Sequence, residues 1–378
     1  MHIRSTLLLG ILWTLLSTGH AQTLRVGVVL SQTGQARLAG SAQANALRAL
    51  EARSAGADIE LFIRDDGSSP VAAAAAVQTL VETEEVHALI CCTTPAATEG
   101  VSRYVEDAGV LTLSLSELPA EANPWLFTLE PDAQRLLQSV ILKQAASAKT
   151  RFALMTLNND FGDEVEAALE RLISPEAGVQ LVAQQRYRPN VSVLTPEALW
   201  VATRLPETVL VWGFSPDVSL AYAALRARGY EGDSVLSPLV LEPSARTDLA
   251  RLVGALLPLS PVRVASTLPL SHPTAEATGA YFRLMASSYG PGRVPPEGAA
   301  AYDALLLLRE AFAQAFSYGV ALEETSVFRS ALRDAFVSMS PVTGASAVYD
   351  YGETDPIGVV PTSLVLGRVV AGGLEYAE

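Results

Sequence analysis

The sequence lacks the residue sets on which most catalytic and metal sites depend. Of its four histidines, only His87 and His272 lie beyond the first 21 residues, and neither belongs to a metal-binding pattern. No GxxxxGK[ST] segment occurs, and the first predicted strand runs into residues 31–34, which are not a GxGxxG loop. Residues 213–217 resemble a nucleophile elbow, but Asp217 stands where the second glycine is required. We therefore expect no bound metal, no cofactor and no enzymatic activity.

Cysteine is equally scarce, because Cys91 and Cys92 are the only two in the chain. Adjacent cysteines rarely pair, since closing an eight-membered ring strains the peptide between them. We expect these residues to be two small apolar groups at the end of a buried strand, with a redox device as the alternative.

Basic residues are outnumbered by acidic ones, 26 to 40, and the net charge is −14. Phosphate backbones repel such an acidic chain, so we expect no nucleic-acid partner. Hydrophobic residues make up 49% of the sequence, which is too many for a disordered chain. No segment reaches the roughly 18 uninterrupted apolar residues of a membrane-spanning helix. With 378 residues, the chain is expected to form a soluble protein of two or three domains.

The first 21 residues differ from the rest and have the three parts of a signal peptide. His2 and Arg4 form a short basic region, residues 6–16 are apolar, and Gly19 and Ala21 supply the small residues before a cleavage site. The alternative, a buried N-terminal helix, would lack a polar face. We expect a signal peptide over residues 1–21, cleavage before Gln22, and a mature protein in the periplasm or extracytoplasmic space. No cysteine follows the apolar run, so no lipid anchor is indicated.

After this region, short β-branched runs alternate with amphipathic stretches that are rich in alanine and leucine. This alternation predicts parallel sheets with helices on both faces, an α/β fold. One series of strands and helices extends from residues 24–30 to 110–115, and a second from 133–146 to 234–236. The sequence therefore predicts two doubly wound, Rossmann-like lobes. Further helices are expected at residues 275–288, 298–316 and 326–336, and strands return near the C-terminus.

Small polar residues follow several predicted strands at their carboxyl ends. In open parallel sheets, ligands bind beyond these ends, where helix N-termini offer free N–H groups. The residues in the first lobe that we expect to surround a bound carboxylate are Thr93, Thr94 and Thr98, and the candidate ligand-binding residues Ser114 and Ser116 follow the next predicted strand. Residues 158–161 and 212–215 hold the corresponding places in the second lobe. Each residue taken singly is also explained as an ordinary cap or turn that faces water.

Five segments together carry a resemblance to a known family: RVGVVLSQTGQARLAG, ALICCTTPAATEG, RFALMTLNNDFGDEV, AAYDALLLLREAF and PVTGASAVYDYGETD. In their order and spacing the chain resembles the Leu/Ile/Val-binding family, the type I periplasmic binding proteins of branched-chain amino acid ABC transporters. The resemblance implies three crossing strands, near Pro131, Val264 and Thr343. It also implies an N-terminal lobe of residues 22–131 and 266–342 and a C-terminal lobe of residues 132–265 and 343–378. Such lobes close on a ligand like a Venus flytrap.

The resemblance also implies a ligand-binding role for particular residues. By this resemblance, the carboxylate of the ligand would lie between residues 92–98 and 114–116. Phe161 stands where the family commonly has a tyrosine. Trp212 and Phe214 would cover an aliphatic or aromatic ligand, with burial in the core as the alternative. Leu239 stands where the family has the acid that receives the α-ammonium group, so Glu242 is the nearest carboxylate.

The function expected from these features is delivery of a small amino acid-like or carboxylate ligand to an ABC transporter permease by a monomeric substrate-binding protein. The alternative is a ligand-sensing module of the same fold that reports to a receptor or regulator.

Overall fold

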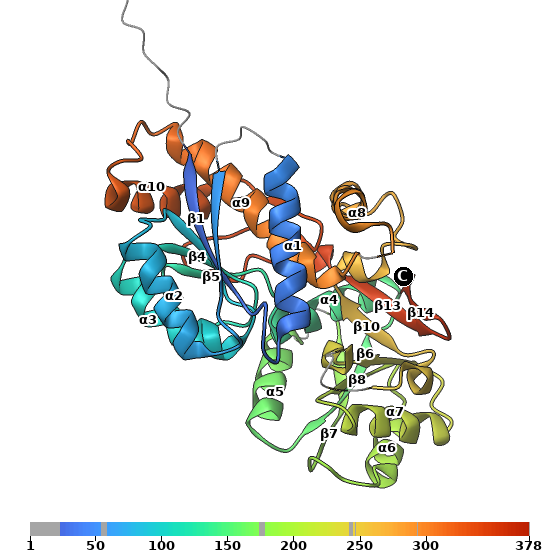
Figure 1. Ribbon diagram of the computed structural model, residues 1–378. Coiled ribbons are helices and arrows are strands. Elements are labelled where there is room, and N and C mark those ends of the chain that lie inside the picture. Colours follow the sequence, from blue (N-terminus) through green and yellow to red (C-terminus); the bar gives the residue numbers. More distant parts are fainter. Residues whose placement is uncertain are drawn as a thin grey trace, which may run out of the picture.

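A computed structural model describes residues 23–53, 59–173, 178–241, 245, 247–292 and 294–377 of the protein. These residues form two α/β lobes, one around a five-stranded sheet and the other around a seven-stranded sheet (Figure 1). Both lobes are doubly wound, as the sequence predicts. Among the described residues, no helix is long and apolar enough to cross a membrane.

The first lobe has a fully parallel sheet in the order β2-β1-β3-β4-β5. Its strands are β1 (Leu24–Leu30), β2 (Ile59–Asp65), β3 (Ala88–Cys91), β4 (Leu111–Ser114) and β5 (Leu126–Thr128). Its helices are α1 (Arg37–Arg53), α2 (Pro70–Glu82), α3 (Pro95–Asp107), α8 (Ala275–Tyr289), α9 (Ala299–Phe316) and α10 (Thr325–Ser338). Helices α2 and α3 pack together on one face of the sheet, and α1 and α9 pack together on the other.

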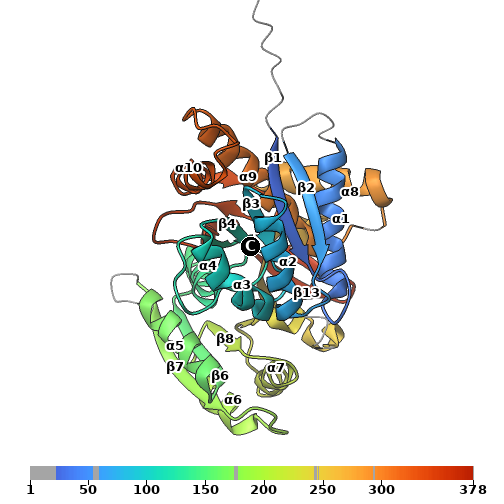
Figure 2. The same ribbon diagram turned by 60° about the vertical axis from the view of Figure 1, so that its left-hand side comes forward.

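The second lobe has a seven-stranded sheet in the order β14-β13-β10-β9-β8-β6-β7. The parallel strands are β6 (Arg151–Leu157), β7 (Gln180–Tyr187), β8 (Thr208–Trp212), β9 (Asp233–Leu236) and β10 (Leu256–Leu259). The antiparallel edge consists of β13 (Val365–Val370) and β14 (Gly373–Ala377). The helices are α4 (Ala133–Ala146), α5 (Asp160–Leu172), α6 (Thr195–Ala202) and α7 (Asp217–Ala227). Helices α5, α6 and α7 lie below the first lobe in Figure 2.

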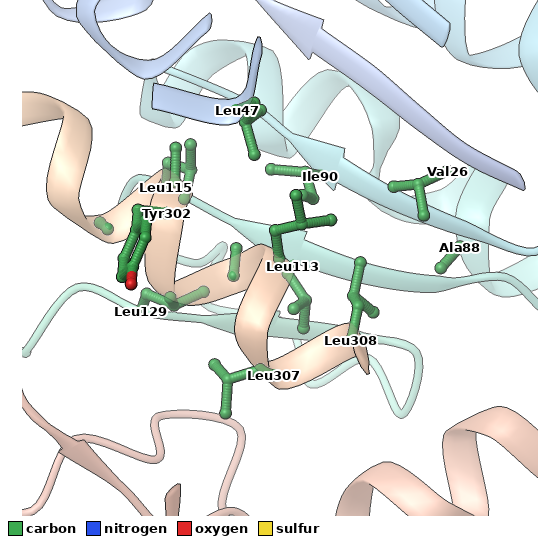
Figure 3. Close-up of a cluster of buried hydrophobic side chains, with 14 of the residues drawn as sticks. Val26, Leu47, Ala88, Ile90, Leu113, Leu115, Leu129, Tyr302, Leu307 and Leu308 are labelled. Carbon is green, nitrogen blue, oxygen red and sulfur yellow. The ribbon is translucent and has the colours of Figure 1, made fainter. Parts of the chain in front are cut away.

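The core of the first lobe shows why these sequences fold as they do. Alternate residues of the parallel strands, such as Val26, Ile90 and Leu113, point to the same face and are completely buried (Figure 3). Leu47 of α1 and Leu308 of α9 cover them and are also fully buried. Each such aliphatic side chain stabilises the fold by about 1.5–3 kcal/mol relative to an exposed one.

The described chain crosses between the two lobes three times. The first crossing joins Leu129, in the core of the first lobe, to Leu137, in the core of the second. At the second crossing, Val264 packs with the second lobe and Val262 with the first. The resemblance implies a third crossing near Thr343, but the third crossing lies later in the chain. Residues 345–359 still pack in the first core, and the chain enters the seven-stranded sheet at Val365.

The last crossing segment starts with a two-stranded ribbon of β11 (Val342–Thr343) and β12 (Val348–Tyr349). The carboxylate of Asp303 on α9 accepts hydrogen bonds from the backbone N–H groups of Ala345 (2.6 Å) and Ser346 (2.8 Å). The hydroxyl of Tyr349 donates a third, at 3.0 Å. Asp303 therefore binds the crossing segment to α9.

Candidate ligand-binding site

Each sheet has a switch point, where successive connections leave in opposite directions along the sheet. In the first sheet this point lies between β1 and β3, and in the second between β6 and β8. Ligands of doubly wound proteins bind beyond the carboxyl ends of the strands at such points. The candidate site is defined by residues that follow these four strands: Ser31, Thr93 and Phe214 in loops, and Phe161 in the first turn of α5.

Three of the predicted hydroxyl groups lie together in the first lobe. The Oγ1 atom of Thr98 lies 3.0 Å from Oγ of Ser114 and 2.8 Å from Oγ of Ser116. Thr98 and Ser114 are fully buried, and Ser116 is nearly so. The structure thus brings Thr98, Ser114 and Ser116 into one hydroxyl cluster, which satisfies its own hydrogen bonds beneath the carboxyl edge of the sheet.

Thr93 and Thr94 are partly exposed at the same edge. The Oγ1 atom of Thr93 accepts a hydrogen bond from the N–H of Ser31 (3.1 Å) and donates one to Oε1 of Gln43 (2.7 Å). Thr94 is the N-cap of α3, and its Oγ1 accepts from the N–H of Ala97 at 3.4 Å. Because Thr93 contacts Ser31, it links the two strands that flank the switch point.

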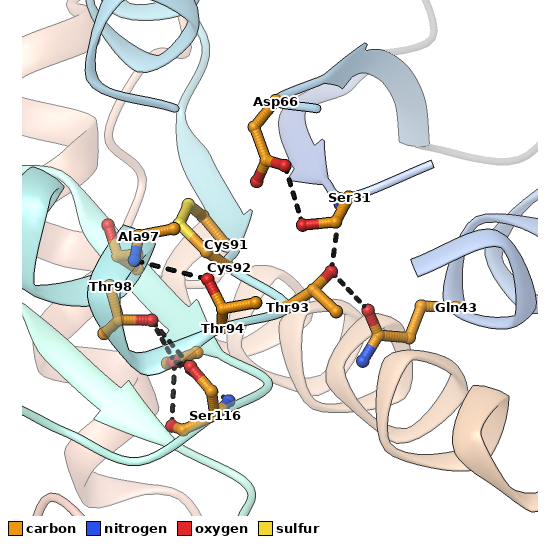
Figure 4. Close-up of a disulfide and its surroundings, with 12 residues drawn as sticks. Ser31, Gln43, Asp66, Cys91, Cys92, Thr93, Thr94, Ala97, Thr98 and Ser116 are labelled. Carbon is orange, nitrogen blue, oxygen red and sulfur yellow. Dashed lines mark hydrogen bonds between the residues drawn. A yellow bond between two sulfur atoms is a disulfide. The ribbon is translucent and has the colours of Figure 1, made fainter. Parts of the chain in front are cut away.

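Cys91 and Cys92 form a disulfide with each other, so the expectation that they do not pair is wrong (Figure 4). That expectation rested on the strain of the eight-membered ring; in the structure the peptide bond between the two residues is cis and their Cα atoms lie 3.1 Å apart. The burial of both residues at the end of β3 agrees with the sequence analysis, since neither is exposed. The disulfide lies directly before Thr93.

The second lobe contributes an aromatic pair at its switch point. The rings of Phe161, at the start of α5, and Phe214, after β8, lie with centroids 4.7 Å apart. Phe214 is 45% exposed, so it is available to cover a ligand. Trp212 is different, because it is only 2% exposed and packs in the core with residues of α4 and β6. Of its two interpretations, burial in the core is the one that the structure supports.

The acidic groups near the carboxyl edge of the second sheet differ in their exposure and in their hydrogen bonds. Leu239 is half-buried in the 3₁₀ turn Pro238–Leu241 after β9, and Glu242 lies outside the described residues. Asp217, at the start of α7, is 5% exposed and accepts a hydrogen bond from the N–H of Asn190 at 2.9 Å. Asp160, at the start of α5, is exposed.

The structure adds residues that the sequence analysis did not select. Ser31 is fully buried, and its hydroxyl donates to the carboxylate of Asp66 at 2.7 Å. In the second lobe, the hydroxyl of Tyr187 is buried without a hydrogen-bond partner in the described structure, and burial raises the pKa of this group. All three lie at or beyond the carboxyl ends of strands, so the rule that selected Thr93 and Ser114 also finds them if every strand is included.

The described residues contain no cluster of three or more His, Cys, Asp or Glu side chains that is placed to hold a metal ion. Polar hydroxyls and an aromatic pair suit a small organic ligand with hydrogen-bonding and apolar parts.

Residues 23–373 match the family model described as periplasmic binding protein. The chain belongs to the periplasmic binding protein family. This membership confirms the family and the fold that the sequence predicts, and it implies an extracytoplasmic location and a ligand-binding role. No match was found among curated proteins.

Solved structures of other periplasmic binding proteins share the fold over nearly the whole chain. An extracellular ligand-binding receptor from Rhodopseudomonas palustris HaA2 is 20% identical with a TM-score of 0.68, covering 94% of this chain and all of its own. A leucine binding protein, LivK, from Thermotoga maritima is 17% identical (TM-score 0.60; 94% and 98% covered). The branched-chain amino acid transporter substrate binding protein LivJ from Streptococcus pneumoniae, solved in complex with isoleucine, is 15% identical (TM-score 0.62; 94% and 99% covered).

Proposed function

We propose that this protein is a non-catalytic solute-binding component of an ABC importer. In this proposal its lobes close around a small carboxylate or amide and deliver it to a membrane permease. One observation carries the proposal: hydroxyl groups gather at the switch point of the first sheet, and two partly exposed aromatic rings lie at the switch point of the second. Solved relatives of the same fold include binding proteins for leucine and for branched-chain amino acids, which supports a ligand of similar size.

The first lobe suits the anionic end of the ligand. Helices α1, α2 and α3 start at the carboxyl edge of the sheet, and none has an acidic residue in its first turn. The positive ends of their dipoles therefore face this edge without a neutralising side chain in the helix. Thr93 and Thr94 lie partly exposed beside the start of α3. The proton of the Thr93 hydroxyl is donated to Gln43, whereas the hydroxyl of Thr94 accepts from Ala97, so Thr94 is the residue whose hydroxyl supports binding of a carboxylate or an amide.

The second lobe suits an apolar group better than an ammonium ion. Phe161 and Phe214 supply apolar surface, and Leu239 cannot accept a hydrogen bond from a cation. Burying an ammonium without a carboxylate partner costs several kcal/mol, and each 1.4 kcal/mol lowers the affinity tenfold. We therefore propose a carboxylate or amide that has no free α-ammonium group, with leucine, isoleucine and valine as weak ligands.

Mass spectrometry of small molecules that copurify with the protein from its native host tests the proposal directly. Thermal-shift assays and calorimetry then compare amino acids, their 2-oxo acids, aromatic carboxylates and short amides. A compound at a hundred times its dissociation constant stabilises the protein by about 2.7 kcal/mol, which raises the melting temperature by several degrees. Loss of cellular uptake of that compound in a strain without the protein would establish the transport role. Unchanged uptake with an altered regulatory response would favour the sensory alternative.

One result would restore the ordinary specificity of the relatives: leucine binding in the micromolar range that is lost in Glu242→Gln. Asp160→Gln is the matched control, because Asp160 is an exposed acid at the start of α5. If neither substitution changes a tight leucine affinity, the ammonium group is bound elsewhere and the argument from Leu239 is wrong.

A further inference from the structure

The Cys91–Cys92 disulfide occupies a specific place relative to the candidate site. Cys91 is the last residue of β3 and pairs with Val29 of β1, so the disulfide lies at the switch point of the first sheet. Both cysteines are fully buried in an apolar cluster between the sheet and helices α2 and α3. The next residues, Thr93 and Thr94, are the partly exposed hydroxyl residues of the site.

The covalent ring restricts the backbone at this point. A disulfide between neighbours closes a ring that contains the Cα–C bond of Cys91 and the N–Cα bond of Cys92. These bonds carry ψ of Cys91 and φ of Cys92, two of the soft backbone torsions that precede Thr93. While the ring is closed, neither torsion rotates freely, which restricts the directions in which the chain can leave β3.

Several hydrogen bonds depend on that direction. Thr93 Oγ1 bonds to the N–H of Ser31 on the other side of the switch point and to Gln43 of α1. Thr94 then caps α3, and Thr98 on the first turns of α3 joins the buried hydroxyl cluster with Ser114 and Ser116. The disulfide thus directly precedes, in the chain, the segment from Thr93 to Thr98, whose hydrogen bonds are drawn in Figure 4.

We propose that the Cys91–Cys92 disulfide is a positioning element of the ligand site, and that its reduction by a thiol reductant weakens ligand binding by releasing Thr93 and Thr94. The inference rests on the proposed ligand-binding function and adds a redox dependence to it.

The chemical step is a thiol–disulfide exchange. A thiolate of a dithiol reductant attacks one cysteine sulfur, forms a mixed disulfide and releases the other cysteine as a thiolate. The second thiolate of the reductant then attacks the reductant sulfur of the mixed disulfide and releases the remaining cysteine. Two electrons and two protons pass to the protein. Cys91 and Cys92 become free thiols, and the reductant is released as a cyclic disulfide. The mass of the protein rises by two hydrogen atoms, and alkylation of the new thiols reports the extent of reduction.

The first test measures amide hydrogen exchange of the full mature chain before and after treatment with dithiothreitol. The amide of Ser31 is the reporter, because its hydrogen bond is accepted by the side chain of Thr93. We expect its exchange rate to rise about tenfold on reduction, as expected when one backbone residue is released. The amide of Asn158 is the control, since it follows β6 in the other lobe and bonds to the carbonyl of Tyr187 at 2.7 Å.

The variant Cys91→Ala/Cys92→Ala supplies the same comparison without a reductant. It should show fast exchange at Ser31 from the start and no response to dithiothreitol. If the buried disulfide resists dithiothreitol, this variant alone decides the matter. Slow exchange at Ser31 in the variant, or in the fully reduced wild type, would overturn the inference, and so would two free thiols in the protein as isolated from its native compartment.

Calorimetry with leucine and with its 2-oxo acid, 4-methyl-2-oxopentanoate, links the exchange result to binding. For whichever probe binds the oxidised protein, the affinity should fall about tenfold in the unlinked variant, while Ser69→Ala, a cap deletion on α2, leaves it unchanged. An unchanged affinity in the unlinked variant counts against the inference. If neither probe binds the oxidised protein, the ligand class proposed above is wrong, and the exchange at Ser31 still decides the role of the disulfide.

Discussion

Asp303 is a fully buried carboxylate with three hydrogen-bond donors around it. Burial raises its pKa to about 6, although the N–H groups of Ser346 and Ala345 and the hydroxyl of Tyr349 act in the opposite direction. The carboxylate also fills the space beside Gly344, where an added Cβ would lie 2.5 Å from the Cγ atom of Asp303. The side chain is therefore matched to the crossing segment in both shape and polarity.

We predict that Asp303→Ala lowers the free energy of unfolding by about 1–3 kcal/mol, because two backbone N–H groups lose their acceptor inside the protein. Chemical denaturation measures this change, and Asp350→Ala, an exposed neighbour in the same segment, is the control with little effect. Ligand binding should persist below the melting temperature. A normal melting temperature with abolished binding would reverse the assignment and make Asp303 a ligand contact.

The protonation of His87 makes the stability of the fold depend on pH. Its Nδ1 atom accepts a hydrogen bond from the N–H of Arg25 at 3.0 Å, and the side chain packs against Phe328. Burial, with a smaller contribution from the positive charge of Arg25, lowers the pKa of His87 to about 4. A protonated ring could no longer accept the bond from Arg25, so the folded state requires the neutral imidazole.

We predict that stability falls as the pH drops from about 6.5, the pKa of histidine in the unfolded chain, to about 4. The folded pKa lies below the unfolded one, so the contribution is complete above pH 6.5 and is lost on acidification. The loss amounts to about 3 kcal/mol. Asp303 acts in the opposite sense, because its raised pKa reduces stability as the pH rises from about 4 to about 6. Denaturation curves of wild type and His87→Asn isolate the histidine effect, and parallel pH profiles for the two proteins would contradict it.

At the scale of elements, two helix starts allow a direct comparison. Ser69 caps α2 and Thr94 caps α3, and each is followed by a proline at the first helical position. The hydroxyl of each cap residue accepts a hydrogen bond from the backbone N–H three residues later in the chain. Only Thr94 lies beside the switch point between β1 and β3. The two caps should contribute similarly to stability but differently to ligand binding.

We predict that Ser69→Ala and Thr94→Ala each lower the free energy of unfolding by about 1 kcal/mol through loss of the cap. Thr94→Ala should also weaken binding of the compound identified by thermal shift by about tenfold, because a hydrogen bond to a charged ligand contributes about 1.5–3 kcal/mol. Calorimetry on both variants makes the measurement. Equal affinities in the two variants would remove Thr94 from the site.

The sequence alone predicts most elements of the fold because their signals are local. The strand at residues 24–30 and the helix at residues 133–146 have the predicted bounds. They combine unbroken apolar or β-branched runs with clear turn residues at their ends, so periodicity is sufficient to place them.

Elements that depend on tertiary contacts were not predicted. Strand β10 contains Pro258, and a proline argues against a central strand. The strand is nevertheless held between β9 and β13, with all four of its residues buried. The short strand β5 is buried beside β4 and has no alternating pattern. At the site, the burial of Trp212 and the pairing of Cys91 with Cys92 depend on backbone geometry that residue types do not encode.

At the scale of the whole molecule, the three crossings are bound to one another. Arg135 of α4, in the second lobe, forms an ion pair with Asp355 at 2.5 Å, and Asp355 lies in the segment whose neighbours pack in the first core. The Oγ atom of Ser260 donates to the carbonyl of Ser346, and the hydroxyl of Tyr351 donates to the carbonyl of Thr128, both at 2.9 Å. These contacts join all three crossings, so a hinge movement would have to bend them as a unit.

Two independent features bear on where this molecule folds. The disulfide of Cys91 and Cys92 is of a kind that persists in oxidising compartments, and the family is extracytoplasmic. Residues 1–21, which lie outside the described residues, have the pattern of a signal peptide. We predict that the exported protein begins at Gln22 and contains no free thiol, whereas a chain that begins at Gln22 and is synthesised in a reducing cytoplasm carries two. Intact mass with and without alkylation measures both properties. A secreted product that retains residues 1–21 would disprove the cleavage, and free thiols in the exported protein would show that export does not form the disulfide.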